Sequence, residues 1–158
     1  MRRVLRGLLT VAACLTVVAG IAALPLISEI WEHRRVCAAN YDSIEAALTP
    51  FDLLDAAPAG ATSDGERGHE CGDTDDHHAT VSRHHRPPER YGSREDIESF
   101  YRDLALRNGW RLPSDEESAG GSGCVVKEAG NAGINFEVRF APDSEDGSYI
   151  VSASTWPC

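Results

Sequence analysis

The chain has 158 residues, of which 25 are acidic and 15 are basic, so its formal charge at neutral pH is −10. Three of the basic residues, Arg2, Arg3 and Arg6, precede an apolar segment, and the rest of the chain carries 12 basic and 25 acidic residues, a formal charge of −13. Such an acidic chain repels nucleic acid and anionic lipid headgroups, so the charge argues against nucleic acid as a partner. Without the apolar segment, the remaining length suits one small domain.

The N-terminal apolar segment predicts a membrane anchor at residues 1–27. Residues 7–27 contain no charge, and a helix of that length measures about 31 Å, which is enough to cross a bilayer. The preceding arginines are expected to stay cytoplasmic and to place the remainder outside the cell membrane. Two alternatives stay open. One is a cleaved signal peptide, whose apolar region is usually shorter, and the other is a lipoprotein modified at Cys14.

A helical arm is predicted at residues 28–56. Its apolar side chains follow the three-to-four-residue spacing of a helix face, namely Ile30, Cys37, Tyr41, Ile44 and Leu48. We expect this face to pack on the domain, because the repeat is too short for a coiled coil. A second short helix is expected to start at Thr49-Pro50, with Pro50 at its first position. Residues 56–72 are rich in Ala, Pro, Gly and acids and predict a surface loop.

Residues 57–158 are predicted to form an α+β domain of order β-α-β-β-β, rich in antiparallel pairing, with one helix packed on the sheet. The first strand, residues 77–86, is polar and is therefore expected at a sheet edge. The other strands are expected at residues 124–128, 134–140 and 149–156. In the third of these four strands the outward positions are Asn135, Glu137 and Arg139.

The best-specified element is a helix over residues 93–110. Ser93 and Asp96 are spaced as a capping box, and Asn108-Gly109 is a helix stop signal. Its apolar face is expected to cover the inward face of the third strand. The helix face consists of Ile97, Phe100, Tyr101 and Leu104, and the strand face consists of Ile134, Phe136, Val138 and Phe140.

Four cysteines follow the apolar segment, and an even number in a small exported domain predicts two disulfides. If the β-α-β unit makes its two strands parallel, Cys71 and Cys124 lie at one end of the sheet and Cys158 lies at the other. The preferred pairing is then Cys71–Cys124 with Cys37–Cys158. The alternative is Cys37–Cys71 with Cys124–Cys158.

Residues 69–85 contain five histidines among several acids, a composition that can bind zinc or copper. The weak candidate ligands are His69, His77, His78, His84 and His85. The spacing argues against a metal centre, because neighbouring residues of a strand point to opposite faces. The alternative is a hydrated polar edge that gains positive charge below about pH 6.5. We therefore expect no cofactor and no resident metal.

Motifs that carry chemistry are missing from the sequence. There is no nucleophile elbow, phosphate-binding loop or zinc-protease helix, and the cysteines are not in redox spacing. Asp73 to Asp76 is loosely similar to a calcium-binding loop but lacks its glycine and its final glutamate. We therefore predict a protein that is not an enzyme.

The plan as a whole resembles a broad type of small actinobacterial proteins, membrane-anchored or exported, without a defined activity. The resemblance rests on the arginine-led apolar segment, residues 91–110 (YGSREDIESFYRDLALRNGW), the paired cysteines and the closing Trp156-Pro157-Cys158. It implies an α+β domain that faces the exterior and implies no activity. The expected function is binding, with an envelope protein as the expected partner; the alternative is metal binding by residues 69–85.

Overall fold

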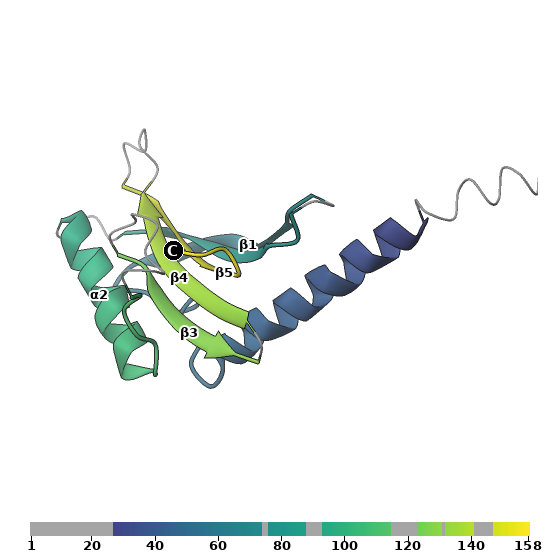
Figure 1. Ribbon diagram of the computed structural model, residues 1–158. Helices are drawn as coiled ribbons and strands as arrows, with labels where there is room; N and C mark the ends of the chain where they lie inside the picture. The colour runs from purple at the N-terminus through teal and green to yellow at the C-terminus, as the bar shows by residue number, and fades with distance from the viewer. Residues whose placement is uncertain (1–26, 74–75, 88–92, 115–122, 131, 141–146) are drawn as a thin grey trace, which may run out of the picture. The chain divides into compact units, whose positions relative to one another are not determined.

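The computed structural model describes residues 27–73, 76–87, 93–114, 123–130, 132–140 and 147–158. The chain divides into two compact units, residues 1–36 and residues 37–158. Within the second unit, five strands form one sheet, drawn as arrows in Figure 1. The α+β class is therefore confirmed.

The strands of this sheet are antiparallel throughout. They are β1 (Thr62–Cys71), β2 (Ala79–Arg86), β3 (Val125–Ala129), β4 (Ala132–Phe140) and β5 (Tyr149–Ser154). Their order across the sheet is β1-β2-β5-β4-β3, and each neighbouring pair is antiparallel. The edges are thus β1 and β3, while β2, β5 and β4 form the interior.

Strand β1 corrects the prediction of a surface loop at residues 56–72, and it takes the edge position expected for residues 77–86. Most of its residues are exposed, so it lacks the apolar alternation that identifies a strand. Ion pairs hold it in place. Arg67 bonds to Asp52 and, at 2.7 Å, to Asp55, which also bonds to Arg83 of β2 at 2.7 Å. Burial opposes the charge of Arg67, but these bonds outweigh burial and raise the pKa of the guanidinium.

The disulfides are Cys37–Cys71 and Cys124–Cys158, so the preferred pairing was wrong and the alternative is observed. The reason is the strand direction. The helix between β2 and β3 joins antiparallel strands, because three antiparallel steps separate them in the sheet. Val125 pairs with Phe136, which in turn pairs with Ala153 near the end of β5. Cys124 therefore lies near the C-terminus.

Helix α2 (Arg94–Arg107) confirms the predicted element and its caps. The Ser93 N–H donates to Asp96 Oδ2 at 2.8 Å, which closes half of the capping box. At the other end Gly109 has φ +84°, and the Trp110 N–H donates to the Ala105 carbonyl at 3.1 Å. This pattern is a Schellman cap.

The core lies between α2 and one face of the sheet, with α2 beside β3 and β4 (Figure 1). The Tyr101 ring lies 5.8 Å from Phe136 and the Trp110 ring 5.9 Å from it. Ile97 and Ile134 are also buried, and the other members of both predicted faces are partly buried against the core. The predicted packing is confirmed.

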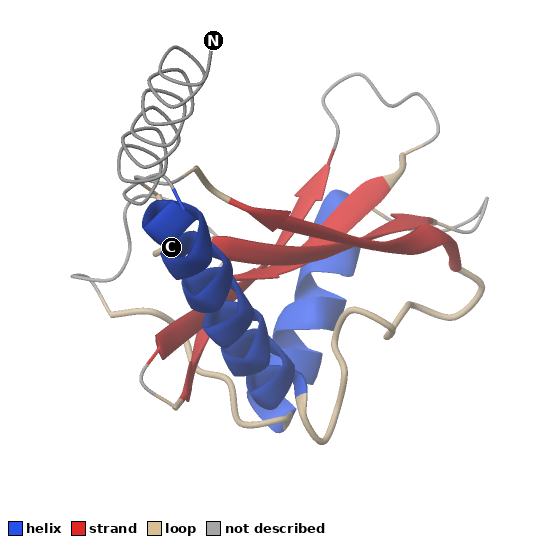
Figure 2. Cartoon of the chain, turned by 90° about the vertical axis from the view of Figure 1, so that its right-hand side faces the viewer, coloured by secondary structure: helices blue, strands red, loops and turns tan. Residues whose placement is uncertain are grey.

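Residues 27–48 are helical, and the helices appear in blue in Figure 2. In the second unit, the end of this helix contributes the predicted Ile44 and Leu48 to the core, together with Ala47. The expected short helix at Thr49-Pro50 does not form. Turns occupy residues 53–55 instead, where Asp52 accepts the Leu54 N–H at 2.9 Å.

Among the described residues, no helix combines the length and the apolar composition that a membrane crossing requires. Apart from Ile27, the predicted anchor at residues 7–27 lies outside the described residues. The same holds for Cys14 and for the middle of the calcium-like sequence, residues 74–75.

Candidate functional site

The sheet face opposite the core is polar. Alternation along β2, β5 and β4 places hydroxyl, amide and carboxylate side chains on this face. Thr80 and Asn135 both pair with Ser154, and Ser82 and Glu137 both pair with Ser152. We call the six residues of these two rows the polar sheet face: Thr80, Ser82, Asn135, Glu137, Ser152 and Ser154.

The C-terminal tail, residues 155–158, folds back at this face. The Thr155 N–H donates to the Ala79 carbonyl at 3.0 Å, and the Thr155 hydroxyl accepts the Ala79 N–H at 2.9 Å. The Trp156 N–H donates to Ser154 Oγ at 3.0 Å. The Cys124–Cys158 disulfide then fixes the end of the tail. These contacts hold the tail next to the polar sheet face.

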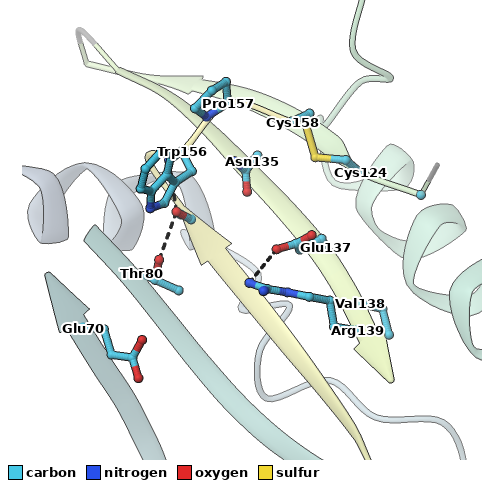
Figure 3. A pocket seen from close by; sticks show the side chains of 12 residues that line it. Glu70, Thr80, Cys124, Asn135, Glu137, Val138, Arg139, Trp156, Pro157 and Cys158 are labelled. Carbon is cyan, nitrogen blue, oxygen red and sulfur yellow. Dashed lines mark hydrogen bonds and ion pairs between the residues drawn. A yellow bond between two sulfur atoms is a disulfide. The ribbon is translucent and has the colours of Figure 1, made fainter. Parts of the chain in front are cut away.

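A cavity of about 500 Å³ lies between the tail and the polar sheet face (Figure 3). β2, β5 and β4 supply its floor, β1 supplies one side, and the tail supplies the indole of Trp156. Its lining includes Glu70, Thr80, Asn135, Glu137, Arg139 and Trp156, together with the Cys124–Cys158 disulfide. A cavity with several convergent polar groups is the expected form of a small-ligand site.

Some polar groups of the cavity are already bonded to one another. Glu137 pairs with Arg139 at 2.8 Å, and the Thr80 hydroxyl donates to Ser154 Oγ at 3.0 Å, as the dashed lines in Figure 3 show. Two others are uncommitted: the carboxylate of Glu70 and the side-chain amide of Asn135 form no hydrogen bond or ion pair with any described residue. Asn135 is nevertheless only 4% exposed. These two groups remain available to a ligand.

The five candidate histidines are dispersed. His84 is exposed and His85 is buried on the opposite face, as strand alternation predicts. The ring of His69 lies 5.7 Å from Tyr41, and the ring of His78 stacks on Trp156 at 4.3 Å. In the described part of the chain, none of the five histidines belongs to a group of three potential metal ligands. The geometry therefore gives the metal alternative no support.

His85 has a structural place in the core. Its Nε2 lies 2.9 Å from the Leu54 carbonyl, so Nε2 carries the proton that is donated there. Its ring stacks on Tyr149 at 5.5 Å. Burial is the main cause that lowers the pKa of His85, and the charge of Arg83 acts in the same direction. His85 is therefore a neutral core residue, and His78 is the one that borders the candidate site through Trp156.

The sequence analysis placed Asn135, Glu137 and Arg139 on the outward face but did not identify them as a site. The sequence does contain a pattern that could have identified the site: polar residues occupy alternate positions in both β2 (Thr80, Ser82) and β5 (Ser152, Ser154). Comparison with protein-family models, curated proteins and solved structures finds no match. The resemblance to actinobacterial exported proteins thus stays a prediction.

Proposed function

We propose that this protein is a membrane-tethered binding protein whose exterior domain takes its ligand in the cavity at the polar sheet face. The observation that carries the proposal is the cavity itself, with an uncommitted carboxylate, an uncommitted buried amide and a half-exposed indole around one space of about 500 Å³. Open carboxylate and amide groups beside one cavity are polar groups that can fix the orientation of a bound ligand.

The exterior location is supported by the two disulfides, because such bonds form and persist in oxidising compartments. The tether is supported by the first unit. Its described residues include Ile27, Ile30 and Trp31, which are 49%, 52% and 68% exposed and directly follow the apolar segment. Tryptophan is enriched at the boundary between membrane and water. An exposed apolar cluster at that position fits a chain that leaves a bilayer there.

Binding rather than catalysis fits the chemistry of the cavity. Among the described residues of its lining, no histidine is present and the two cysteines are bonded to each other, so neither can serve as a thiolate nucleophile. The ion pair of the cavity lining, Glu137–Arg139, joins two residues of the same strand. We therefore assign recognition to this site, with an exposed segment of another envelope protein as the proposed partner.

The test is capture of the partner from membranes with the full-length chain, followed by cross-linking and mass spectrometry. Trp156→Ala removes the indole of the cavity. Trp31→Ala removes a more exposed indole outside the cavity and serves as the control. We expect a captured partner protein that the Trp31→Ala variant still binds and the Trp156→Ala variant no longer binds. Identical capture by the two variants would contradict the cavity as the binding site.

The tether has a separate test, immunoblotting of the membrane and secreted fractions. The full-length chain is expected in the membrane fraction. A shortened protein in the medium would contradict the anchor and favour the cleaved signal peptide.

A further inference from the structure

We infer that the cavity recognises a basic side chain of a peptide, an ammonium or guanidinium group; this inference rests on the proposed binding function. The first reason is charge. The cavity contains Glu70, Glu137 and Arg139, and the last two neutralise each other at 2.8 Å. Glu70 is left as an uncompensated, exposed carboxylate on the edge strand β1. A charge-assisted hydrogen bond to a carboxylate is the strongest contact that a basic side chain can make.

The second reason is the Asn135 amide, which reaches the cavity from β4 (Figure 3). The residue is 4% exposed and its side chain has no partner among the described residues. Its carbonyl oxygen can accept a hydrogen bond from a donor that enters the cavity. Ammonium and guanidinium groups carry three and five such donors and no acceptor, so they suit a site whose open groups accept.

The third reason is Trp156. Its indole is 49% exposed, borders the cavity and is stacked on the His78 ring at 4.3 Å. The stacking holds the indole in one orientation. Tryptophan is the best aromatic partner for a cation placed within about 6 Å of its ring. The Glu70 carboxylate and the fixed indole of Trp156 border the same cavity, and together they can bind a cation.

Among the described lining residues the one basic side chain is Arg139, which is already paired with Glu137, so an anionic ligand finds no uncommitted positive charge on them. The formal charge of the whole chain, −10, also attracts cations and repels anions. A neutral sugar could use the indole and the amide but would gain nothing from Glu70. Charge therefore separates the basic peptide from both alternatives.

The experiment measures the Kd of a hexa-arginine peptide for the full-length chain in nanodiscs of phosphatidylcholine, a lipid whose headgroup has no net charge, with empty nanodiscs as the blank. Glu70→Gln removes the cavity carboxylate and keeps its shape. Glu66→Gln makes the same charge change on the same strand at an exposed position outside the cavity, so it is the matched control. We expect Glu70→Gln to raise the Kd about tenfold, since bonds to charged groups are among the stronger ones, and Glu66→Gln to change it less than about twofold.

Three results would overturn the inference: no binding of hexa-arginine, equal weakening by the two variants, or tighter binding of the neutral sugar chitohexaose. If chitohexaose binds more tightly and the Trp156→Ala variant loses that binding, the basic ligand is refuted and the proposed function still stands. Partner capture that is unchanged by Trp156→Ala would instead refute the proposed function itself. The two failures are therefore distinguishable.

Discussion

At the residue scale, His84 and His85 show how one position in a strand decides the behaviour of a side chain. They are neighbours in sequence, but His84 is exposed while His85 is 1% exposed, stacked on Tyr149 and bonded to the Leu54 carbonyl. Strand alternation predicts the opposite directions. It does not predict which face is covered, because that depends on segments far away in the chain.

Burial of His85 predicts that the domain loses stability in mild acid. Because the pKa of His85 is lowered in the folded state, the unfolded chain takes up the proton first as the pH falls below about 6.5. The free energy of unfolding is then expected to fall below that pH, by at most about 1.4 kcal/mol per pH unit. Urea unfolding between pH 7.5 and pH 5 measures this slope.

Two variants identify the residue responsible for the slope. His85→Phe cannot take up a proton, so its slope between pH 6.5 and pH 5 is expected to be flatter than that of the wild type, whatever its overall stability. His84→Gln removes the exposed neighbour and should retain the wild-type slope. A slope that follows His84 would show that the buried ring is not its cause.

At the element scale, α2 was predictable because its determinants are local. A 3.6-residue apolar period, a capping pair and an Asn-Gly stop lie within its own residues. β1 was missed because its determinants are not local. It forms through pairing with β2 and through the bonds of Arg67 to Asp52 and Asp55, which lie outside the strand. A polar, glycine-containing strand looks like a loop until its partners are known.

The capping box predicts a measurable share of the stability of α2. Asp96→Ala removes the 2.8 Å bond to the Ser93 N–H and a negative charge at the positive end of the helix dipole. We expect a loss of about 1 kcal/mol in the free energy of unfolding, measured by urea titration. Asp103→Ala is the matched control, because it removes an exposed aspartate from the middle of the helix. An equal loss in both variants would contradict the role of the cap.

At the scale of the whole molecule, the order of the strands accounts for what sequence reasoning could not reach. The lining groups of the cavity come from β1, β2, β4, the end of β5 and the tail, and these segments are spread along the sequence. Asn135 and Glu137 could be placed on an outward face from alternation alone. Their meeting with Thr80 and Trp156 requires that β5 lie between β2 and β4 and that the tail return through Cys158. Neither condition has a local signal.

The two disulfides are expected to contribute equally to the free energy of unfolding. Both join cysteines separated by 34 residues, and the chain-entropy model makes the effect depend on that length. Replacing Cys37 and Cys71 by serine, or Cys124 and Cys158 by serine, is expected to cost about 3–4 kcal/mol in each case. Urea unfolding checks the magnitude. Non-reducing peptide mapping checks the pairing, and recovery of Cys71–Cys124 would contradict the antiparallel arrangement of β2 and β3.

The same two bonds decide how the oxidised chain responds to mechanical force. Tension applied at the two ends of the chain passes from Cys37 directly to Cys71 and from Cys124 directly to Cys158. The residues inside each loop, including β1, β3, β4 and β5, are therefore relieved of load, and within residues 37–158 only the segment between Cys71 and Cys124 can lengthen. Within residues 37–158, a chain tethered at its N-terminus and pulled through its tail would extend by unravelling β2 and α2, with its other four strands still closed in covalent rings.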